Sequence, residues 1–376
     1  MDELYQKLLT YDDAWCETMG FFNPYTDPFD HTFTRKLPMF DKRAYMSNPK
    51  YSFVYDKLWV CQSQDINSGR LESITPDSNI HYPIFIKPRW GHKSASSKNC
   101  FKINSYSELS KYRHLNEMMW SEYIEGTENM TDYVMVNGHI VYQITYLYSD
   151  TQNGFIESYK LISPDNEPPP NITEWVDTHL TGYTGVVNIQ YRSAKIIEAG
   201  LRLARGGAYI QSTENKNIID MINQVYDTGT YTPLPKDSYN FKPFYSFKCF
   251  TRLPILYLFP QYVIDVIMYL FGCKPFYEYY FEPNGRDGCV FFQFLHHNKN
   301  IGHLCVALWT LLFVLAQIIV ILIIFIGLYF AFTKSKLPKY GRNLIILMIL
   351  LYLTQYLNPI SVHYNLYKAK KQRNFF

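Results

Sequence analysis

Apolar and polar residues alternate on both sides of a polar turn in the stretch GVVNIQYRSAKIIEAG, which begins at Gly185. Such alternation around a turn predicts a β-hairpin, with strands over Val186–Tyr191 and Lys195–Ala199 and a turn of Arg-Ser-Ala between them. With the turn centred on its alanine, Gln190 stands opposite Glu198, and directly opposed residues share a face with Cβ atoms roughly 5 Å apart. An amide oxygen beside a carboxylate suits Mg²⁺. The alternative is a surface hairpin with an incidental Gln–Glu pair.

A second strand pair is predicted upstream. Tyr82–Ile86 is apolar and Cys100–Ile103 reads as its return, with the loop Arg89–Asn99 between them. Lys87 stands at the end of the first strand, and Pro88 cannot continue the hydrogen-bond ladder. Small residues in the loop let backbone N–H groups surround an anion, to which Lys87 would add a point charge. The alternative is a solvated basic loop.

The next segment combines an extended stretch with a hairpin. The backbone of Glu122-Tyr123-Ile124 could pair with an adenine edge, and the carboxylate of Glu128 could accept both hydroxyls of a ribose. The alternative for Glu128 is an exposed charge at a strand end. Asp132–Val136 and His139–Ile144 then form a hairpin through Asn-Gly, the strongest short turn signal.

Helices are expected where apolar residues recur at helical spacing. Ser105 followed by Glu108 resembles a capping box. Helices are predicted over Tyr106–Leu115, Glu174–Leu180 and Asn215–Gln224, and a strand or short helix over Tyr51–Cys61. Ser163–Asn171 is predicted to be a proline-rich loop or lid.

The C-terminal third is apolar. His303–Thr333 contains no Lys, Arg, Asp or Glu, and a membrane span needs about 20 such residues. Asn343–Ile360 is a second uncharged run, and a short basic turn joins the two. The sequence therefore predicts two transmembrane helices in a hairpin. Leu253–Phe271 is interrupted by two prolines and Asp265, which favours an interfacial or packed helix.

The membrane topology is less consistent. A cytosolic N-terminal domain places Lys334–Arg342 on the far side, against the positive-inside tendency, whereas the basic tail after Lys368 agrees with it. The alternative is that one of the two spans is re-entrant, which leaves both basic segments inside. We expect five regions: residues 1–80 as an N-terminal region, 81–230 as the main domain, 231–300 as an aromatic interfacial linker, 301–362 as two spans, and 363–376 as a basic tail.

Composition narrows the class of protein. The chain has 376 residues, 47% hydrophobic and 18% charged, which excludes a disordered chain. Its net charge of +3 gives no reason to expect a nucleic-acid partner. The 7 cysteines show no CxxC spacing, which favours free thiols in a reducing compartment. The acidic N-terminus lacks the apolar segment of a secretory signal. His296, His297 and His303 could suggest a metal, but histidines near a membrane entry are more often interfacial.

With its motifs in this order, the chain resembles the ATP-grasp superfamily from about Tyr51 to Tyr209. That family binds ATP between two α+β subdomains and forms an acyl-phosphate on a carboxylate, which an amine then attacks. The resemblance implies an α+β, ATP-grasp fold, here followed by a C-terminal transmembrane hairpin. It also implies ATP and Mg²⁺, or Mn²⁺ in its place, together with an unidentified carboxylate and amine.

The resemblance carries roles onto positions of this sequence. Asp56-Lys57 resembles the early phosphate-binding lysine, YPIFIKP the strand that ends in a nucleotide-contacting lysine, EYIEGTE the hinge, and NIQ…IIEAGLR the metal-binding hairpin. The implied nucleotide-binding residues are Lys57, Lys87, Ser94, Ser96, Glu122, Tyr123, Ile124 and Glu128, the implied metal ligands are Gln190 and Glu198, and the implied catalytic residues are Arg202 and Lys87.

One position departs from the family's Glu-x-Asn-x-Arg pattern, because Gly200 stands at the middle ligand and offers no side-chain oxygen. Three hypotheses follow. The first is a membrane-anchored ligase that activates a carboxylate with Mg-ATP. The second is a nucleotide-binding pseudoenzyme that acts as a membrane scaffold. The third is a non-enzymatic membrane protein whose motif matches are coincidental.

Overall fold

The protein is described from a computed structural model. It describes residues 33–34, 36–38, 41–93, 99–150, 152–153, 156–251, 261–275, 289–333 and 339–353. Contacts divide the chain into two compact units, the first covering Phe29–Tyr245. The described residues of the second unit start at Ser246.

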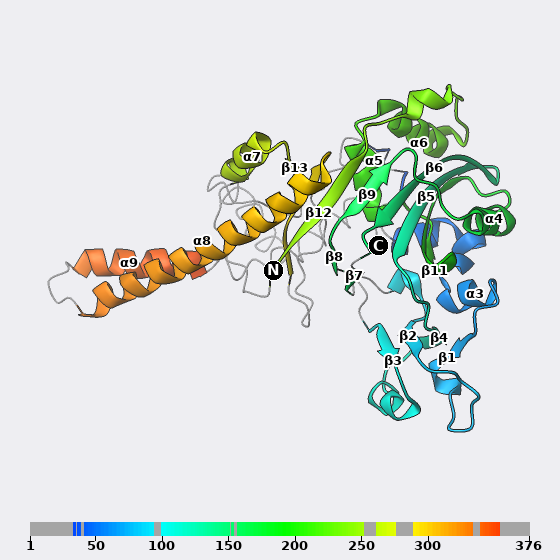
Figure 1. The fold of residues 1–376 in the computed structure, drawn as a ribbon, viewed down its shortest axis with the longest axis horizontal. Coiled ribbons are helices and arrows are strands. Elements are labelled where there is room, and N and C mark those ends of the chain that lie inside the picture. Colours follow the sequence, from blue (N-terminus) through cyan, green and yellow to red (C-terminus); the bar gives the residue numbers. More distant parts are fainter. Residues whose placement is uncertain are drawn as a thin grey trace, which may run out of the picture. The chain divides into compact units, whose positions relative to one another are not determined.

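An antiparallel sheet forms the centre of the first unit (Figure 1). The helix α4 (Pro170–His179) and the turns of helix at Pro49–Gln62 pack against it, and their apolar side chains form one core with Val187 and Ile189. The strands lie in the order β11 (Lys195–Gly200), β10 (Gly185–Arg192), β5 (Glu128–Val136), β6 (His139–Tyr148) and β9 (Lys160–Ser163), and a separate ribbon is formed by β7 (Gln152–Asn153) and β8 (Ile156–Glu157).

The β5–β6 hairpin confirms the prediction made from Asn-Gly. Asn137 and Gly138 both have positive φ, 50° and 82°, which a two-residue hairpin turn of this kind requires. Glycine is needed at the second position for another reason, because a Cβ on Gly138 would lie 2.3 Å from the backbone nitrogen of Gly182. The turn therefore packs directly on the segment that leads into β10.

The β10–β11 hairpin is also present, but its turn is shorter than expected. Arg192 pairs with Lys195, so the loop contains two residues, not the three predicted. The register then shifts between Gln190 and Tyr191, because Ile197 is an extra residue in β11. This β-bulge restores Gln190 to the position opposite Glu198. The predicted pairing is confirmed, although the turn from which we inferred it was wrong.

A smaller four-stranded sheet lies beside the first (Figure 1). The predicted strand pair around the basic loop is confirmed within it, with Lys87 one residue before the end of the first strand. Its own apolar core includes Ile84, Ile86 and Trp120. The strand order is β1 (Ser68–Arg70), β4 (Met118–Glu122), β2 (Ile84–Pro88) and β3 (Phe101–Ile103).

The expected helices are present with different bounds. Tyr51–Cys61 is helical, as the 3-10 helix Pro49–Tyr55 and the α-helix α3 (Lys57–Gln62). The helix at Tyr106 is a short 3-10 helix, and the capping box is wrong, because Glu108 accepts from the N–H of Asn104 (2.8 Å). The proline-rich loop is shorter than expected, because α4 begins within it. The other α-helices described in this unit are α2 (Asp41–Ser47), α5 (Ala208–Ser212) and α6 (Lys216–Thr228).

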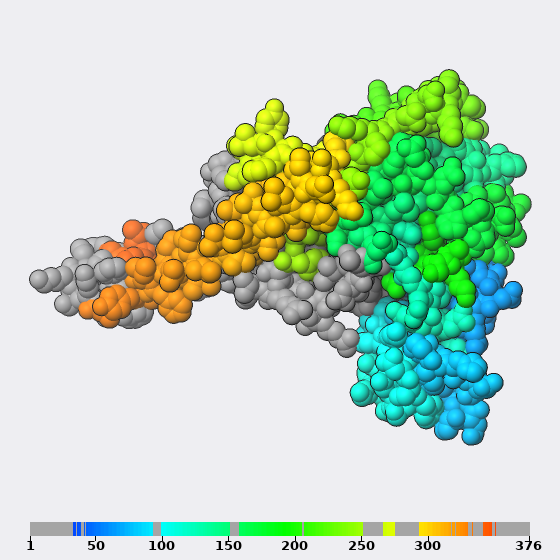
Figure 2. Space-filling model, in the orientation of Figure 1, coloured from blue at the N-terminus to red at the C-terminus, as the bar shows by residue number. Residues whose placement is uncertain are grey.

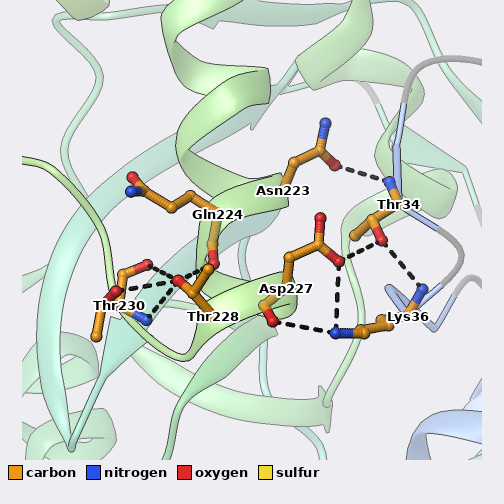
Figure 3. Close-up of polar contacts among 7 residues, drawn as sticks. All are labelled: Thr34, Lys36, Asn223, Gln224, Asp227, Thr228 and Thr230. Carbon is orange, nitrogen blue, oxygen red and sulfur yellow. Dashed lines mark hydrogen bonds and ion pairs between the residues drawn. The ribbon is translucent and has the colours of Figure 1, made fainter.

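The segment before α2 is fastened to α6 (Figure 3). The backbone N–H of Thr34 donates to the side-chain oxygen of Asn223 (2.8 Å), and its hydroxyl donates to Asp227 (2.8 Å). Lys36 donates to the backbone carbonyl of Asp227 (3.0 Å) and forms an ion pair with its carboxylate (3.7 Å). These contacts hold Thr34 and Lys36 against α6 just before the chain enters α2.

The second unit contains one very long apolar helix, α8 (Lys299–Thr333). Its segment Lys299–Tyr329 is the one helix in the described part of the chain that is long and apolar enough to cross a membrane. Figure 2 shows that much of the surface of this helix is uncovered, and only 6% of its most apolar stretch is buried. The other elements are β12 (Phe244–Thr251), β13 (Lys274–Pro275), β14 (Cys289–His296), α7 (Gln261–Leu270) and α9 (Lys339–Leu353).

The predicted second span is only partly described. The helix α9 has 15 residues, which corresponds to roughly 22 Å at 1.5 Å per residue, short of a bilayer core of about 30 Å. The predicted basic turn Lys334–Arg342 is shorter than expected, because α9 already begins at Lys339. Residues 334–338 and the chain after Leu353 lie outside the described residues. Of the segment Leu253–Phe271, the structure describes the helix α7 (Gln261–Leu270), whose Val266, Tyr269 and Leu270 are exposed, and its interfacial position stays a prediction.

Candidate nucleotide and cation site

The N-terminus of α3 is fastened to the end of β2, and this places two lysines together. Asp56 caps α3 by accepting from the N–H of Leu58 (3.1 Å). The guanidinium of Arg89 grips the same carboxylate with two hydrogen bonds. The N–H of Lys57 then donates to the carbonyl of Arg89 (2.9 Å). Lys57, at the start of the helix, is therefore held beside Lys87, at the end of the strand.

Lys57 faces the β10–β11 hairpin. Its Nζ lies 3.3 Å from Oε2 of Glu198, and the lysine side chain is only 6% exposed. The loop after β2 reaches the same point, since a Cβ on Gly91 would lie 3.5 Å from Oε1 of Glu198 and 3.6 Å from Cε of Lys57. Helix α3, strand β11 and the start of the basic loop therefore meet around one carboxylate.

Lys87 is buried next to Lys57. Its Nζ donates to the carbonyl of Ile197 (2.7 Å), which is the extra residue of the bulge and therefore has a carbonyl outside the regular ladder. Burial lowers the pKa of Lys87 and the neighbouring charge of Lys57 lowers it further, while Cys61 and Glu198 act in the opposite direction. The bulge thus supports both features of the site, the lysine contact and the position of Glu198.

The Cys100 thiol shows that four of the predicted residues converge. Burial raises its pKa, the positive charges of Lys57 and Lys87 lower it, and the negative charges of Glu198 and Glu128 raise it. Sequence reasoning missed both this cysteine and Cys61, since neither has a ligand spacing or a reactive motif around it.

The hairpin donors fit a magnesium ion that nucleotide phosphates also ligate. Gln190 and Glu198 are direct partners in the ladder and share one face. Magnesium is usually held by one or two carboxylates together with phosphates and waters. In the part of the chain that the structure describes, no cluster of three His, Cys, Asp or Glu side chains is placed to hold a metal by itself. The protein donors therefore suit a cation that arrives with a phosphate.

Arg202 lies beyond β11 and pairs with a residue that the sequence did not indicate. Its guanidinium donates to Oδ2 of Asp41 in α2 (2.9 Å) and to the carbonyl of Leu203 (3.1 Å). Tyr55 accepts from the N–H of Leu201 (2.9 Å), and burial, followed by the charge of Asp41, raises the pKa of its phenol. Asp41, Tyr55 and Arg202 therefore form one polar group at the end of the hairpin.

The segment Glu122-Tyr123-Ile124, which we predicted to be extended, begins at the last residue of β4. The carboxylate of Glu122 pairs with Lys195 (2.6 Å), and the N–H of Tyr123 donates to Pro83 (3.3 Å). Ile124 packs against a small apolar cluster beside α3. The adenine contact remains a prediction.

The proposed ribose carboxylate has a partner within the sheet. Glu128 begins β5 opposite Arg192, and the two side chains pair at 3.0 Å. Its role toward a ribose therefore remains a prediction. Ser94 and Ser96 lie outside the described residues.

A second buried charge, Asp132, went unnoticed in the sequence because a lone aspartate in an apolar strand carries no motif. It accepts from Tyr146 (2.8 Å), Asn188 (2.8 Å) and the N–H of Ala204 (2.9 Å). Burial raises its pKa to about 6, against the hydrogen bonds, which lower it. These bonds join β5, β6, β10 and the turn after Arg202.

No family model matches the chain, and no curated protein matches it. Among solved structures, it is similar to carboxyaminoimidazole ribonucleotide synthase from Aspergillus clavatus complexed with ATP, with a TM-score of 0.50 and 12% identity over 69% of this chain and 75% of that one. N5-carboxyaminoimidazole synthetase from Staphylococcus aureus complexed with ADP follows, with a TM-score of 0.48 and 12% identity over 71% and 76%. An L-amino acid ligase from Bacillus licheniformis gives 0.43 and 13% over 68% and 69%.

At these identities the likeness concerns the fold alone. The first of these structures shows that the chain shares its α+β fold. Within this fold, α3 contacts both sheets of the first unit, at β11 in the larger sheet and at β1 and β4 in the smaller one.

Proposed function

We propose that the first unit binds ATP together with a divalent cation and uses it to activate a carboxylate for attack by an amine. The observation that carries the proposal is the pair of lysines beside Glu198. Lys57 and Lys87 are 4% and 6% exposed, and the charge of Lys57 adds to burial in lowering the pKa of Lys87. Burying a charge costs free energy unless it is compensated. Two buried lysines beside Glu198 suit a polyanionic ligand that is bound together with a divalent cation.

Each residue has a role that follows from its position. Lys57 and Lys87 would neutralise phosphate oxygens as point charges. Gln190 and Glu198 would hold Mg²⁺, or Mn²⁺, which spreads charge over the phosphates when bound. Arg202 would clamp a phosphate or acyl-phosphate with its planar fork. The hinge at Glu122-Tyr123-Ile124 would receive the adenine, and Glu128 the ribose.

The reaction class is the one that the resemblance implies. A carboxylate oxygen attacks the γ-phosphorus of ATP, the bond to the β-phosphate oxygen breaks, and ADP leaves. The nitrogen of the amine then attacks the acyl carbon, inorganic phosphate leaves, and the amine loses a proton. The buried lysines stabilise the negative charge on the transferred phosphoryl group, so the chain needs no covalent nucleophile.

The test is nucleotide binding by the full chain in detergent micelles. Titration calorimetry with Mg-ATP should show binding to the native protein and a loss of at least about tenfold for Lys87→Met. Lys111→Met, which removes a charge from an exposed position in the 3-10 helix at Tyr106, is the matched control and should bind normally. A folded native protein that shows no heat with Mg-ATP would contradict the proposal.

A second candidate is a nucleotide-binding protein that does not turn ATP over. Gly200 favours it, since this position of the metal-binding hairpin lacks a side chain. ADP release on addition of amino acids or peptides separates the two candidates. Carboxylate-dependent release supports the ligase, whereas tight Mg-ATP binding with no release under any acceptor supports the pseudoenzyme.

Anchoring to a membrane is supported by α8. Its apolar surface includes Leu322, Ile323 and Phe325, each more than half exposed, as expected for a helix whose solvent is lipid. We infer a multi-pass anchor with the nucleotide-binding unit in the cytosol and the chain after Asn343 as a second span. Protein that stays with membranes in alkaline carbonate supports this, and release into the soluble fraction contradicts it. Cysteine accessibility at 334–338 from either side decides between a hairpin and a re-entrant segment.

A further inference from the structure

A neighbouring side chain, and not the backbone conformation, explains why position 200 is a glycine. Its φ lies outside the left-handed region that favours glycine, and it ends a regular strand. A Cβ at this position would lie 2.9 Å from Oδ1 of Asp41, closer than a real Cβ contact. The carboxylate of Asp41 therefore occupies the space that a side chain at position 200 would enter.

Asp41 is held there from several sides. Its second oxygen, Oδ2, accepts from Arg202 (2.9 Å). Tyr55 borders the same space, with its hydroxyl 3.7 Å from the Cβ position of Gly200. Farther along α2, Tyr45 stacks on His92, with ring centroids 3.8 Å apart. The helix thus contacts both the loop after β2 and the end of β11.

The carboxylate enters on the face of the cation site. Glu198 and Gly200 are two residues apart in β11 and so point to the same face. Two steps along a strand span about 7 Å, within the reach of two carboxylates that share one or two cations about 4 Å apart. Oδ1, the oxygen not bound to Arg202, is the one that faces Gly200.

We propose that Asp41 provides, from helix α2, the side-chain oxygen that Gly200 lacks, and that it acts as a ligand in the nucleotide-bound cation site. The proposal rests on the proposed function, since it concerns the cation that accompanies the nucleotide. It extends the site beyond the segment Tyr51–Tyr209, where the motifs lie, into a part of the chain without a recognisable pattern. In this proposal Asp41 supplies from α2 the ligand oxygen that the family pattern has on the strand, at the position where this chain has Gly200.

The experiment measures Mn²⁺ binding to the full chain in the presence of ADP, by the electron paramagnetic resonance signal of free Mn²⁺. Asp41→Ala should weaken Mn²⁺ binding at least about tenfold, because one charged ligand is lost. Gly200→Asn in the same background should recover most of this loss, because the asparagine oxygen then enters the space that Asp41 has left. Asp77→Ala, at an exposed loop position, is the control and should change nothing.

The outcomes separate the inference from the proposed function. Native protein that binds Mn²⁺ with ADP, together with an Asp41→Ala variant that binds equally well or better, overturns the inference and leaves the proposed function in place. In that case Asp41 only neutralises Arg202. Failure of Gly200→Asn to recover binding in the Asp41→Ala background also overturns it. If the native protein binds no Mn-ADP, both fail. Asp41→Asn, which keeps the shape and a contact with Arg202, serves if Asp41→Ala does not fold, and should weaken binding several-fold.

Discussion

Charge is buried around Asp132 and around the pair Lys57 and Lys87, and the two places differ in how that charge is compensated. Around Asp132 the chain provides its own compensation: a phenol, an amide and a backbone N–H all donate to the carboxylate. Around Lys57 and Lys87, two cations of the same sign lie together. Nζ of Lys57 lies 3.3 Å from a carboxylate oxygen of Glu198, and Nζ of Lys87 donates to the carbonyl of Ile197 (2.7 Å). Both places are almost fully buried.

The difference indicates what each place is for. A buried charge that accepts several hydrogen bonds fixes the elements that donate them, and removing it leaves those donors unsatisfied. Burial disfavours the charged form in both places, but the hydrogen bonds to Asp132 oppose this effect, whereas the neighbouring charge of Lys57 adds to it at Lys87. We therefore expect Asp132 to be required for stability, and the lysine pair to be required for binding.

The largest expected effect is that of Asp132→Ala. The change leaves the N–H of Ala204, the hydroxyl of Tyr146 and the amide of Asn188 without their acceptor, in a position with no access to water. Removing one member of such a buried network costs about 3–5 kcal/mol. Thermal unfolding of the full chain, followed by circular dichroism, should show a large fall in the midpoint.

Asp132→Asn is the matched control for that prediction. One amide oxygen can still accept from Ala204 and Asn188, and the phenol of Tyr146 can accept from the new amide group. The loss should therefore be clearly smaller than for alanine. Equal losses for the two variants would show that the hydrogen bonds are not what makes Asp132 important.

The next effect is a dependence of stability on pH. The pKa of Asp132 is raised to about 6, from 3.8 for the unburied group. The folded protein therefore keeps this proton between about pH 4 and pH 6, where the unfolded chain releases it, so the stability it gives is present at low pH and is lost as pH rises through about 6. The difference is worth about 3 kcal/mol. The unfolding midpoint of native protein minus that of Asp132→Asn should fall between pH 4 and pH 7, and a constant difference contradicts the shift.

The β10–β11 hairpin shows how far the sequence could predict this site. Alternation around a polar turn was enough to predict the two strands, but the pairing of Gln190 with Glu198 was inferred from a three-residue turn that is absent, and the bulge restores it. It could not reveal the bulge at Ile197, because a bulge has no compositional signal when the extra residue is another isoleucine. Without the bulge, the carbonyl that binds Lys87 would belong to the ladder, so the least predictable residue of the hairpin is central to its geometry.

Contacts between distant segments were the other limit. The bidentate grip of Arg89 on Asp56, and the approach of Asp41 to Gly200, join residues far apart in the chain. Nothing local marks Arg89 or Asp41 as a partner, and only the packing of α2 and α3 against the sheets brings the pairs together. Lys87 could be found because it follows an apolar strand, whereas Lys57 was singled out by the resemblance.

A smaller effect is expected in the cation site itself. Glu198→Gln removes the carboxylate that faces Lys57 and should weaken the binding of Mg-ATP about 10- to 100-fold, equivalent to about 1.4–2.8 kcal/mol. Glu128→Gln breaks the pair with Arg192 and should weaken binding less. Calorimetry with Mg-ATP measures both. Equal losses would count against a metal role for Glu198.

The smallest effect on stability, and the one that tests the contrast most sharply, is expected for Lys87→Met. Methionine has a similar length and no charge, so the change removes desolvation of a cation and its repulsion from Lys57. It also leaves the carbonyl of Ile197 without its donor, at a cost of about 1–3 kcal/mol. The two contributions oppose each other, so the unfolding midpoint should change little while Mg-ATP binding falls at least about tenfold. A loss of stability as large as that of Asp132→Ala would show that Lys87 is a structural charge like Asp132, and the distinction between the two buried sites would then be wrong.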